Sequence, residues 1–163
     1  VLAAGSILDY HGDAFVNAAN EGCVGGFGVD EVVNRAGGFE LKQARKELRG
    51  CATGSAKMTG AFAHDRTRWI IHAVGPVYRV SRIPKKNEGG VQSGGVPKTV
   101  TDLDEDLRSA YRASFTLARL NKMATLGFCF LSSGVFRGER DLSEVIEIGM
   151  RTVVEELSAT RSG

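Results

Sequence analysis

Glycine and small polar residues gather in two segments of the sequence whose chemistry suits the binding of an anion. The first segment, residues 20–30, has four glycines between Asn20 and Asp30, and the second, residues 132–138, reads Ser-Ser-Gly-Val-Phe-Arg-Gly. Glycine lets backbone N–H groups approach an anion closely, and a helix that follows adds a favourable dipole. Two such segments that face each other fit a diphosphate better than a single phosphate. Either segment alone could equally be a tight turn.

Each glycine-rich segment follows a stretch that predicts a β-strand, at residues 14–19 and 124–131. Ligands of open α/β sheets bind at the carboxyl ends of strands, so this placement favours a binding site over two simple turns. The common phosphate motifs are absent: there is no G-x-x-x-x-G-K-[ST], and Glu31 stands where G-x-G-x-x-G requires its last glycine. We therefore expect neither a P-loop enzyme nor a Rossmann dehydrogenase.

The elements that must position these segments follow from the apolar periodicity. Further strands are predicted at residues 2–7, 57–63 and 68–74, and helices at residues 29–36, 41–48, 102–118 and 142–157. Asp102 with Glu105, and Asp141 with Glu144, are expected to form capping boxes at the starts of the last two helices. The alternation of strands and helices predicts an α/β sandwich, in a single domain that spans residues 1–163.

The charge and hydropathy patterns argue against several classes of protein. The net charge of +2 is too small to indicate nucleic-acid binding, and the absence of a run of about 18 apolar residues argues against a membrane span. Residues 79–101 hold five basic residues against one acid, and we expect them to form a mobile, basic insertion loop. Contact of this loop with RNA is the less favoured interpretation, because only the flanking Tyr78 could stack on bases.

The cysteines indicate the redox compartment. Cys23, Cys51 and Cys129 lie far apart without a C-x-x-C pair, which argues against a zinc site and against a disulfide framework. Because Cys23 has no basic neighbour in the sequence, a nucleophilic role for it is weakly supported. No signal peptide is visible, so we expect an intracellular protein, cytoplasmic or nuclear, although a chain that starts at Val1 leaves a removed targeting segment open.

Ordered blocks of residues resemble a known family. Residues 16–20, 25–30 and 34–38 resemble the first signature of the macrodomain family, and residues 53–59, 71–76 and 132–136 resemble its later blocks, in the family's order. The resemblance covers nearly the whole chain except residues 79–101. Asp30, ten positions after Asn20, is similar to the MacroD-type class, which hydrolyses ADP-ribose esters. The resemblance implies a three-layer α/β/α fold with a mixed sheet.

The resemblance also implies a role for each residue of the two segments. Asn20 would bind the hydroxyls of the distal ribose, Asp30 would orient or deprotonate the attacking water, and Phe136 would cover that ribose. The diphosphate would be clamped by the backbone N–H groups of Gly26, Gly28, Val29, Ser133, Gly134, Val135 and Phe136. Asn17 is expected to tie down the first loop, and His72, inside the most apolar strand, is expected to be a core histidine.

Three departures from the family pattern carry expectations of their own. Ser6 stands where the family usually has an aspartate that binds adenine, which leaves the backbone of Ile7 as the expected adenine contact. Phe27 replaces a common glycine, and this is tolerable only if its φ is not positive. Residues 158–163 are too short and polar for the final strand of the family, so the sheet is expected to lack that strand.

The sequence therefore predicts an ADP-ribose-binding hydrolase that removes mono-ADP-ribose from acidic side chains of proteins and deacetylates O-acetyl-ADP-ribose. Its partners would be ADP-ribose or ADP-ribosylated proteins, with neither nucleic acid nor a membrane involved, and we expect a monomer. No cofactor and no metal are expected, because Asp30 and the phosphate of the substrate can activate water. Two alternatives stay open: a non-catalytic reader of ADP-ribose, and, more remotely, a domain that binds RNA or poly(ADP-ribose). We expect Asp30→Ala to lose turnover while folding almost normally.

Overall fold

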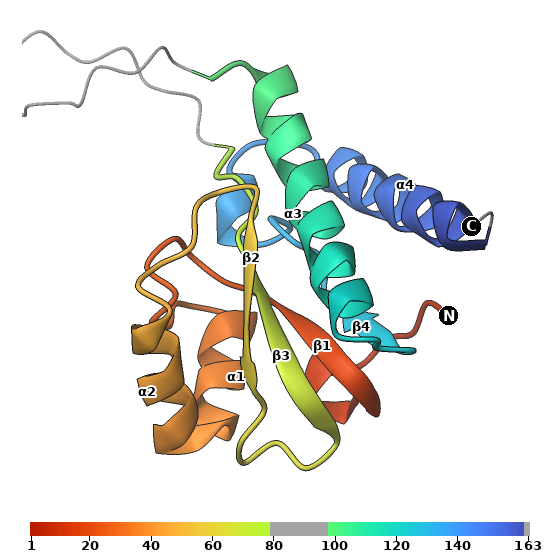
Figure 1. Cartoon of the computed structure of the whole chain (residues 1–163). Coiled ribbons are helices and arrows are strands. Elements are labelled where there is room, and N and C mark those ends of the chain that lie inside the picture. Colours follow the sequence, from red (N-terminus) through yellow and green to blue (C-terminus); the bar gives the residue numbers. More distant parts are fainter. Residues whose placement is uncertain (79–97, 162–163) are drawn as a thin grey trace, which may run out of the picture.

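A four-stranded mixed sheet forms the centre of the molecule (Figure 1). The computed structural model describes residues 1–78 and 98–161, and the sheet order within them is β2-β3-β1-β4. The strands are β1 (Gly12–Ala18), β2 (Ala56–Gly60), β3 (Thr67–Ala73) and β4 (Leu126–Phe128). Strand β1 pairs in parallel with β3 and with β4, whereas β2 pairs with β3 in the antiparallel direction. The mixed sheet that the sequence predicted is confirmed.

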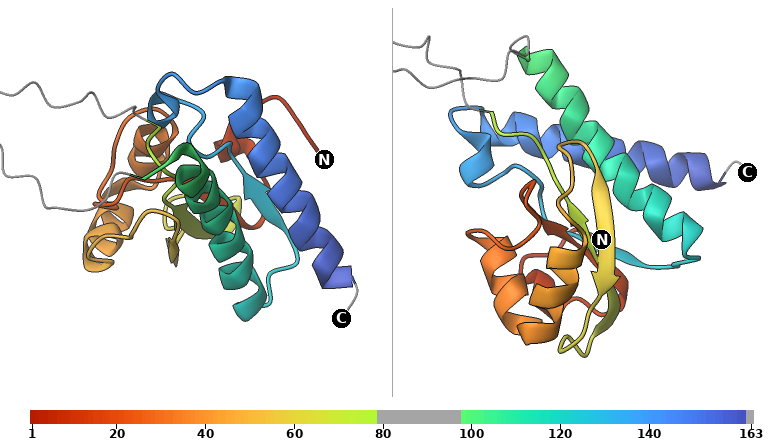
Figure 2. Two further views of the ribbon diagram at one scale, coloured as in Figure 1. Left: turned by 90° about the horizontal axis from the view of Figure 1, so that it is seen from above. Right: turned by 60° about the vertical axis from the view of Figure 1, so that its left-hand side comes forward.

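Helices cover both faces of this sheet (Figure 2). Helices α1 (Val29–Ala36) and α2 (Gly38–Glu47) lie on one face, where Phe15 and Ile70 pack with Val33. Helices α3 (Val100–Leu120) and α4 (Leu142–Arg161) lie on the other face, where Val16 and Ile71 belong to a second cluster of buried apolar residues. Successive residues of a strand point to opposite faces, so the apolar run of β3 fills both cores. This is the predicted three-layer α/β/α fold.

The predicted strand at residues 2–7 is wrong. Residues 1–6 belong to no helix or strand, and Ile7–Asp9 form the short 3₁₀-helix η1. Ser6 Oγ caps η1 by accepting from the Leu8 N–H at 3.2 Å. A strand needs a neighbouring backbone, and the two edges of β1 are already paired with β3 and β4. The outer edges of β2 and β4 have no paired strand in the described residues, but residues 2–7 pair with neither, so their apolar pattern alone does not produce a strand.

The edge strand β4 is shorter than predicted, with three residues in place of eight. It pairs only with β1, and in the described part of the chain no strand follows α4. The expectation that the sheet lacks a final strand therefore holds for residues 1–78 and 98–161. No helix in these ranges combines the length and the apolar content that a membrane crossing needs.

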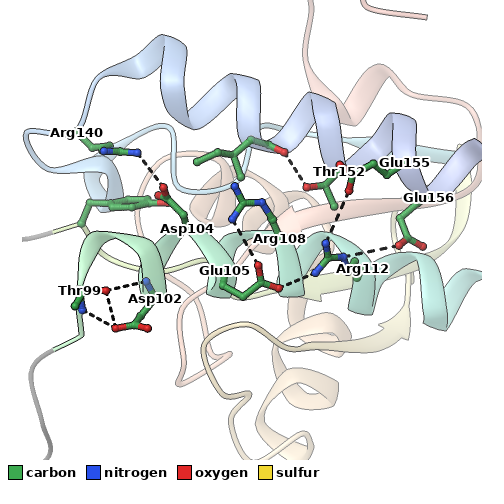
Figure 3. Close-up of polar contacts among 12 residues, drawn as sticks. Thr99, Asp102, Asp104, Glu105, Arg108, Arg112, Arg140, Thr152, Glu155 and Glu156 are labelled. Atoms are coloured by element: carbon green, nitrogen blue, oxygen red, sulfur yellow. Dashed lines mark hydrogen bonds and ion pairs between the residues drawn. The ribbon is translucent and has the colours of Figure 1, made fainter.

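One of the two predicted capping boxes is displaced (Figure 3). Helix α3 begins at Val100 because Thr99 is its N-cap: Thr99 Oγ1 accepts from the Asp102 N–H at 3.2 Å, and Asp102 Oδ2 accepts from the Thr99 N–H at 2.8 Å. Asp102 is thus the third residue of the helix, not its cap. Asp141 does cap α4 by accepting from the Ser143 N–H at 2.8 Å. Most of the predicted loop 79–101 lies outside the described residues.

Candidate functional site

The first glycine-rich segment forms a loop between β1 and α1 that Asn20 holds together. Asn20 Nδ2 donates to the carbonyl oxygen of Gly25 at 2.7 Å, and Asn20 Oδ1 accepts from the N–H of Cys23 at 3.0 Å. The loop turns through positive φ at Gly25 (121°) and Gly28 (66°), and Phe27 keeps a negative φ as its side chain requires. The glycines therefore take the conformations that only they adopt readily.

Both glycine-rich segments lead into helices whose starts have no side-chain cap. Gly28 is the N-cap of α1 and Gly134 is the N-cap of η2 (Val135–Arg137), and neither end has a side-chain cap hydrogen bond. The first N–H groups of a helix have no partner within the helix, and the helix dipole makes this end positive. Two uncapped starts of this kind offer N–H donors to an anionic group.

The second loop is anchored from behind by hydroxyl and backbone hydrogen bonds. Ser132 Oγ donates to the carbonyl oxygen of Pro76 at 2.7 Å, and Ser133 Oγ donates to that of Phe130 at 2.8 Å. The N–H of Tyr78, after β3, donates to the carbonyl oxygen of Phe136 at 2.7 Å. These bonds fix the loop on the side away from the N-cap of η2.

Two arginines that flank the second loop are bound to protein groups. Arg140 pairs with Asp104 of α3 at 3.0 Å, and its guanidinium lies 5.8 Å from the centre of the Tyr78 ring (Figure 3). Arg137 Nη1 donates to the carbonyl oxygen of Arg140 at 2.5 Å. Both arginines therefore fasten the loop to α3 and to itself.

Asp30 is buried, with 3% of its surface exposed, although it lies in the first turn of a helix. Its Oδ1 receives a hydrogen bond from Asn17 Nδ2 at 2.6 Å and lies 2.7 Å from Arg45 Nη2. Asn17 thus holds the carboxylate at the end of the first segment, as expected of a residue that ties down the loop, and Asn20 holds the middle of the same loop. Asp30 Oδ2 has no hydrogen-bond partner among the described residues.

Asn20 and Asp30 converge on the backbone of Gly26. A Cβ atom at Gly26 would lie 3.1 Å from Asn20 Nδ2 and 3.1 Å from Asp30 Oδ2. Because Gly26 has no side chain, these two polar atoms pack closely around the position that its Cβ would occupy, and Asp30 Oδ2 is itself buried there. Asn20 Nδ2 donates one of its two hydrogens to the carbonyl oxygen of Gly25, so its second hydrogen can still be donated. Asp30 Oδ2 can still accept a hydrogen bond. The site thus presents a donor and an acceptor next to each other.

His72 stands behind Asn17 as a neutral core residue. Burial, aided by the charge of Arg45, lowers the pKa of His72 to about 3. The Asn17 amide nitrogen lies 3.2 Å from His72 Nδ1 and can only donate, so Nδ1 accepts and Nε2 carries the proton toward Thr59 Oγ1 at 2.9 Å. The prediction of a satisfied core histidine is confirmed.

The thiols near the site are free but poorly suited to nucleophilic chemistry. Burial raises the pKa of Cys23 to about 11, and it raises the pKa of Cys51 as well. A thiol with a raised pKa is protonated at neutral pH and attacks slowly. Within the described ranges, no three His, Cys, Asp or Glu side chains form a group that could hold a metal ion.

A cavity joins the two loops next to Asn20. It measures about 530 Å³, within the range of small-molecule sites, and its lining includes Asn20 and Glu21 from the first loop and Phe136 from the second. Thr53, Lys98 and Asp106 supply further polar groups around it. The structure therefore brings Asn20 and Phe136, which are 116 positions apart, to one hollow.

The remaining predicted residues lie at the rim or apart from this hollow. Val29 and Val135 are 40% and 69% exposed, at the start of α1 and of η2. Ile7 lies in η1 and packs on the core cluster that contains Phe15 and Val33. Ile7 is not among the residues that line the cavity beside Asn20, so the structure does not bring it together with Asn20 and Phe136.

Arg45 is the site residue that the sequence analysis missed. It lies on α2, its exposed fraction is 0%, and it pairs with Asp30. A signal was present, since Arg45 follows Leu41 by four residues and precedes Leu48 by three, which places it on the apolar face of the helix. A lone charge on such a face indicates a buried partner elsewhere in the fold.

The sequence is similar to that of one described family. The family model for the Macro domain matches residues 16–146. A macro domain-containing protein of Ralstonia nicotianae is 38% identical over 143 residues, which is 88% of this chain and 71% of the relative. The ADP-ribose glycohydrolase MACROD2 of Xenopus laevis is 33% identical over 157 residues, which is 96% of this chain but 33% of the longer relative.

Solved structures share the fold. The Oceanobacillus iheyensis macrodomain with ADPR, which carries one substitution, superposes with a TM-score of 0.74 at 27% identity, over 93% of this chain and 74% of that one. The Trypanosoma brucei macrodomain in complex with ADP gives a TM-score of 0.75 at 30% identity, over 95% of this chain and 55% of that one.

Proposed function

The chain belongs to the Macro domain family, and on that premise we propose that it binds ADP-ribose and hydrolyses the ester that joins ADP-ribose to acidic side chains of proteins. The observation that carries the proposal is the convergence of Asn20 Nδ2 and Asp30 Oδ2 on one point beside the backbone of Gly26. A donor and an acceptor placed side by side suit a ribose hydroxyl or a water molecule.

The two uncapped loops would take the diphosphate. Its oxygens would accept from the backbone N–H groups around Gly26, Gly28 and Val29 on one side and of residues 133–136 on the other. The distal ribose would then lie between Asn20 and Phe136, at the mouth of the cavity that they share. The backbone of Ile7 would meet the adenine end.

Solved relatives support the choice of ligand and of the two polar residues. One Oceanobacillus iheyensis structure carries ADPR and one Trypanosoma brucei structure carries ADP. Two further structures of the Oceanobacillus iheyensis protein carry alanine in place of an asparagine and of an aspartate that are ten residues apart. Asn20 and Asp30 have the same residue types and the same spacing.

The chemistry adds one water molecule across the ester, which releases ADP-ribose and the free carboxylic acid of the protein side chain. Asp30 Oδ2 would accept a hydrogen from the attacking water and so orient or deprotonate it. The phosphate of the substrate would assist, and the proposed mechanism uses no metal ion. The cavity beside Asn20 would receive the linked side chain, or the acetyl group of O-acetyl-ADP-ribose.

One observation favours a second candidate function, a non-catalytic reader of ADP-ribose. Asp30 is only 3% exposed and is paired with Arg45, so its carboxylate has a structural role whether or not it meets water. Enzyme and reader share the same pocket, and only turnover distinguishes them.

Release of ADP-ribose from a glutamate-modified protein tests the proposal. We expect the wild type to turn over, and Asp30→Asn to lose about 10²–10⁴-fold in rate, the usual contribution of a positioned acid–base group. Glu31→Gln, which changes the exposed neighbouring acid of the same helix turn, is the matched control and should keep the wild-type rate. A wild type that binds ADP-ribose but releases none would establish the reader instead.

Calorimetry tests how the ligand lies in the site. ADP-ribose should bind more tightly than AMP or adenosine, because only its diphosphate and distal ribose reach both loops. NAD should bind less tightly than ADP-ribose, since nicotinamide would crowd the end where Asn20 and Asp30 lie. Equal affinities for AMP and ADP-ribose would overturn this placement.

A further inference from the structure

Arg45 connects three parts of the candidate site through one buried guanidinium. From α2, its Nε donates to the carbonyl oxygen of Cys23 in the first loop at 2.8 Å, and its Nη2 lies 2.7 Å from Asp30 Oδ1 in α1. The side chain has no exposed surface. A buried cation loses its hydration, so its position is set by the groups that replace water. Arg45 therefore ties the loop and the carboxylate to one another.

The same contacts decide which carboxylate oxygen of Asp30 is available. Oδ1 lies within 2.7 Å of both Arg45 Nη2 and Asn17 Nδ2. Oδ2 is buried beside Gly26 and has no hydrogen-bond partner in the described residues. The hydrogen bond from Asn17 and the ion pair with Arg45 both hold Oδ1, so Oδ2 is the carboxylate oxygen left without a partner for a ligand or water.

The support for this arrangement continues behind Asn17. The second hydrogen of its Nδ2 points to His72 Nδ1 at 3.2 Å, and His72 is in turn held by Thr59 Oγ1 at 2.9 Å. Asn17, Thr59 and His72 are all buried. Asn17 therefore has little freedom to turn its amide away from Asp30, and the carboxylate is held directly from β1 and from α2.

We propose that Arg45 is a positioning residue of the hydrolase site: it holds Asp30 with Oδ2 toward the ligand and, through the Cys23 carbonyl, keeps the first loop at the same point. The inference rests on the proposed hydrolase function. Arg45 itself is buried behind Asp30 and touches no ligand, so its effect on the reaction passes through the carboxylate.

Arg45→Lys is the variant that tests the geometry, because it keeps the buried positive charge but not the planar fork. A lysine ammonium cannot reproduce the fixed spacing of the two guanidinium contacts. We expect the variant to bind ADP-ribose within about threefold of the wild type and to lose about 10²-fold in kcat, as a displacement of about 1 Å can cause. Arg35→Lys makes the same change at an exposed position of α1 and should leave kcat and KM unchanged.

A double-mutant cycle separates positioning from a general structural role. If Arg45 acts through Asp30, Arg45→Lys should slow the wild type but should not slow Asp30→Asn any further. Thermal melting of each variant is the folding control. Losses that multiply in the double variant, or a wild-type kcat for Arg45→Lys, would overturn the inference.

A second pair of variants covers the case in which Arg45→Lys melts below the assay temperature. Asp30→Asn is then compared with the double variant Asp30→Asn/Arg45→Met. The double variant removes both charges of the buried pair and so leaves no unpaired buried charge. Equal rates for these two support positioning, and a further tenfold loss in the double variant contradicts it. If the wild type itself releases no ADP-ribose, the proposed function fails and the inference fails with it. If the wild type does turn over, the Arg45 variants test the positioning role separately from the proposed function.

Discussion

Substitution of Gly26 by alanine would place a methyl group at the point on which Asn20 and Asp30 converge. The added methyl group would lie 3.1 Å from Asn20 Nδ2 and 3.1 Å from Asp30 Oδ2. Gly26 does not adopt a positive φ, so the backbone accepts alanine without strain. The neighbours need to shift by only a few tenths of an ångström. We therefore expect a small loss of stability, about 1 kcal/mol, which lowers Tm by about 2–4 °C.

The same methyl group should also weaken ligand binding. It would block the hydrogen bond from the neutral Asn20 to the distal ribose, worth about 0.5–1.5 kcal/mol, whereas Asp30 acts on the attacking water. Because 1.4 kcal/mol corresponds to a factor of ten, this loss predicts ADP-ribose binding weaker by about two- to tenfold. AMP does not reach these two side chains in our placement, so its affinity should change little.

Isothermal titration calorimetry with ADP-ribose and AMP measures both effects, and thermal melting reports the fold. Gly22→Ala is the matched control in the same loop, because its Cβ would make ordinary contacts, 3.5 Å from Asn20 Oδ1 and 3.6 Å from Val24 Cγ2. If Gly26→Ala binds ADP-ribose as tightly as Gly22→Ala and the wild type do, Asn20 does not meet the ligand beside Gly26, and our reasoning is refuted.

Three further predictions test the adenine end, the core histidine and the second loop. Ser6→Asp can still cap η1 and should tighten ADP-ribose binding by at most about 1.5–3 kcal/mol in calorimetry; an unchanged affinity would show that adenine is held elsewhere. The folded-state pKa of His72 is about 3, below its ordinary 6.5, so protonation favours unfolding and stability falls as pH drops from 6.5 toward 3. By pH 5 this should cost about 2 kcal/mol in urea unfolding, and His72→Gln should lack that part of the pH slope; identical slopes would contradict the assignment. Gly75→Ala would place its Cβ against Ser132 Oγ and should destabilise the fold by about 1–3 kcal/mol in thermal melting, whereas Gly60→Ala, with only ordinary contacts, should cost less.

The sequence by itself determined the elements that local patterns specify. Helical spacing of Val29, Val33 and Ala36 and the apolar run of β3 gave elements close to those of the structure, because periodicity reports which face of an element is buried. The two glycine-rich segments and their positions after strands were equally visible. Residues 2–7 failed the same test, since a short apolar segment does not by itself supply the hydrogen-bonded neighbour that a strand needs.

Only the tertiary structure decided how the candidate site is held. Asp30 was expected to be dispensable for folding, but it is the partner of a fully buried Arg45 from the next helix. Asp30→Ala should therefore destabilise the protein as well as slow it, contrary to the sequence-based expectation. Asn17 supports Asp30 at the end of the loop, and Asn20 holds the middle of the loop. The physical reason is that periodicity identifies the buried face of a helix but not the partner of a charged residue on that face. A buried charge takes its position from its partner, and that partner is known only once the helices are packed.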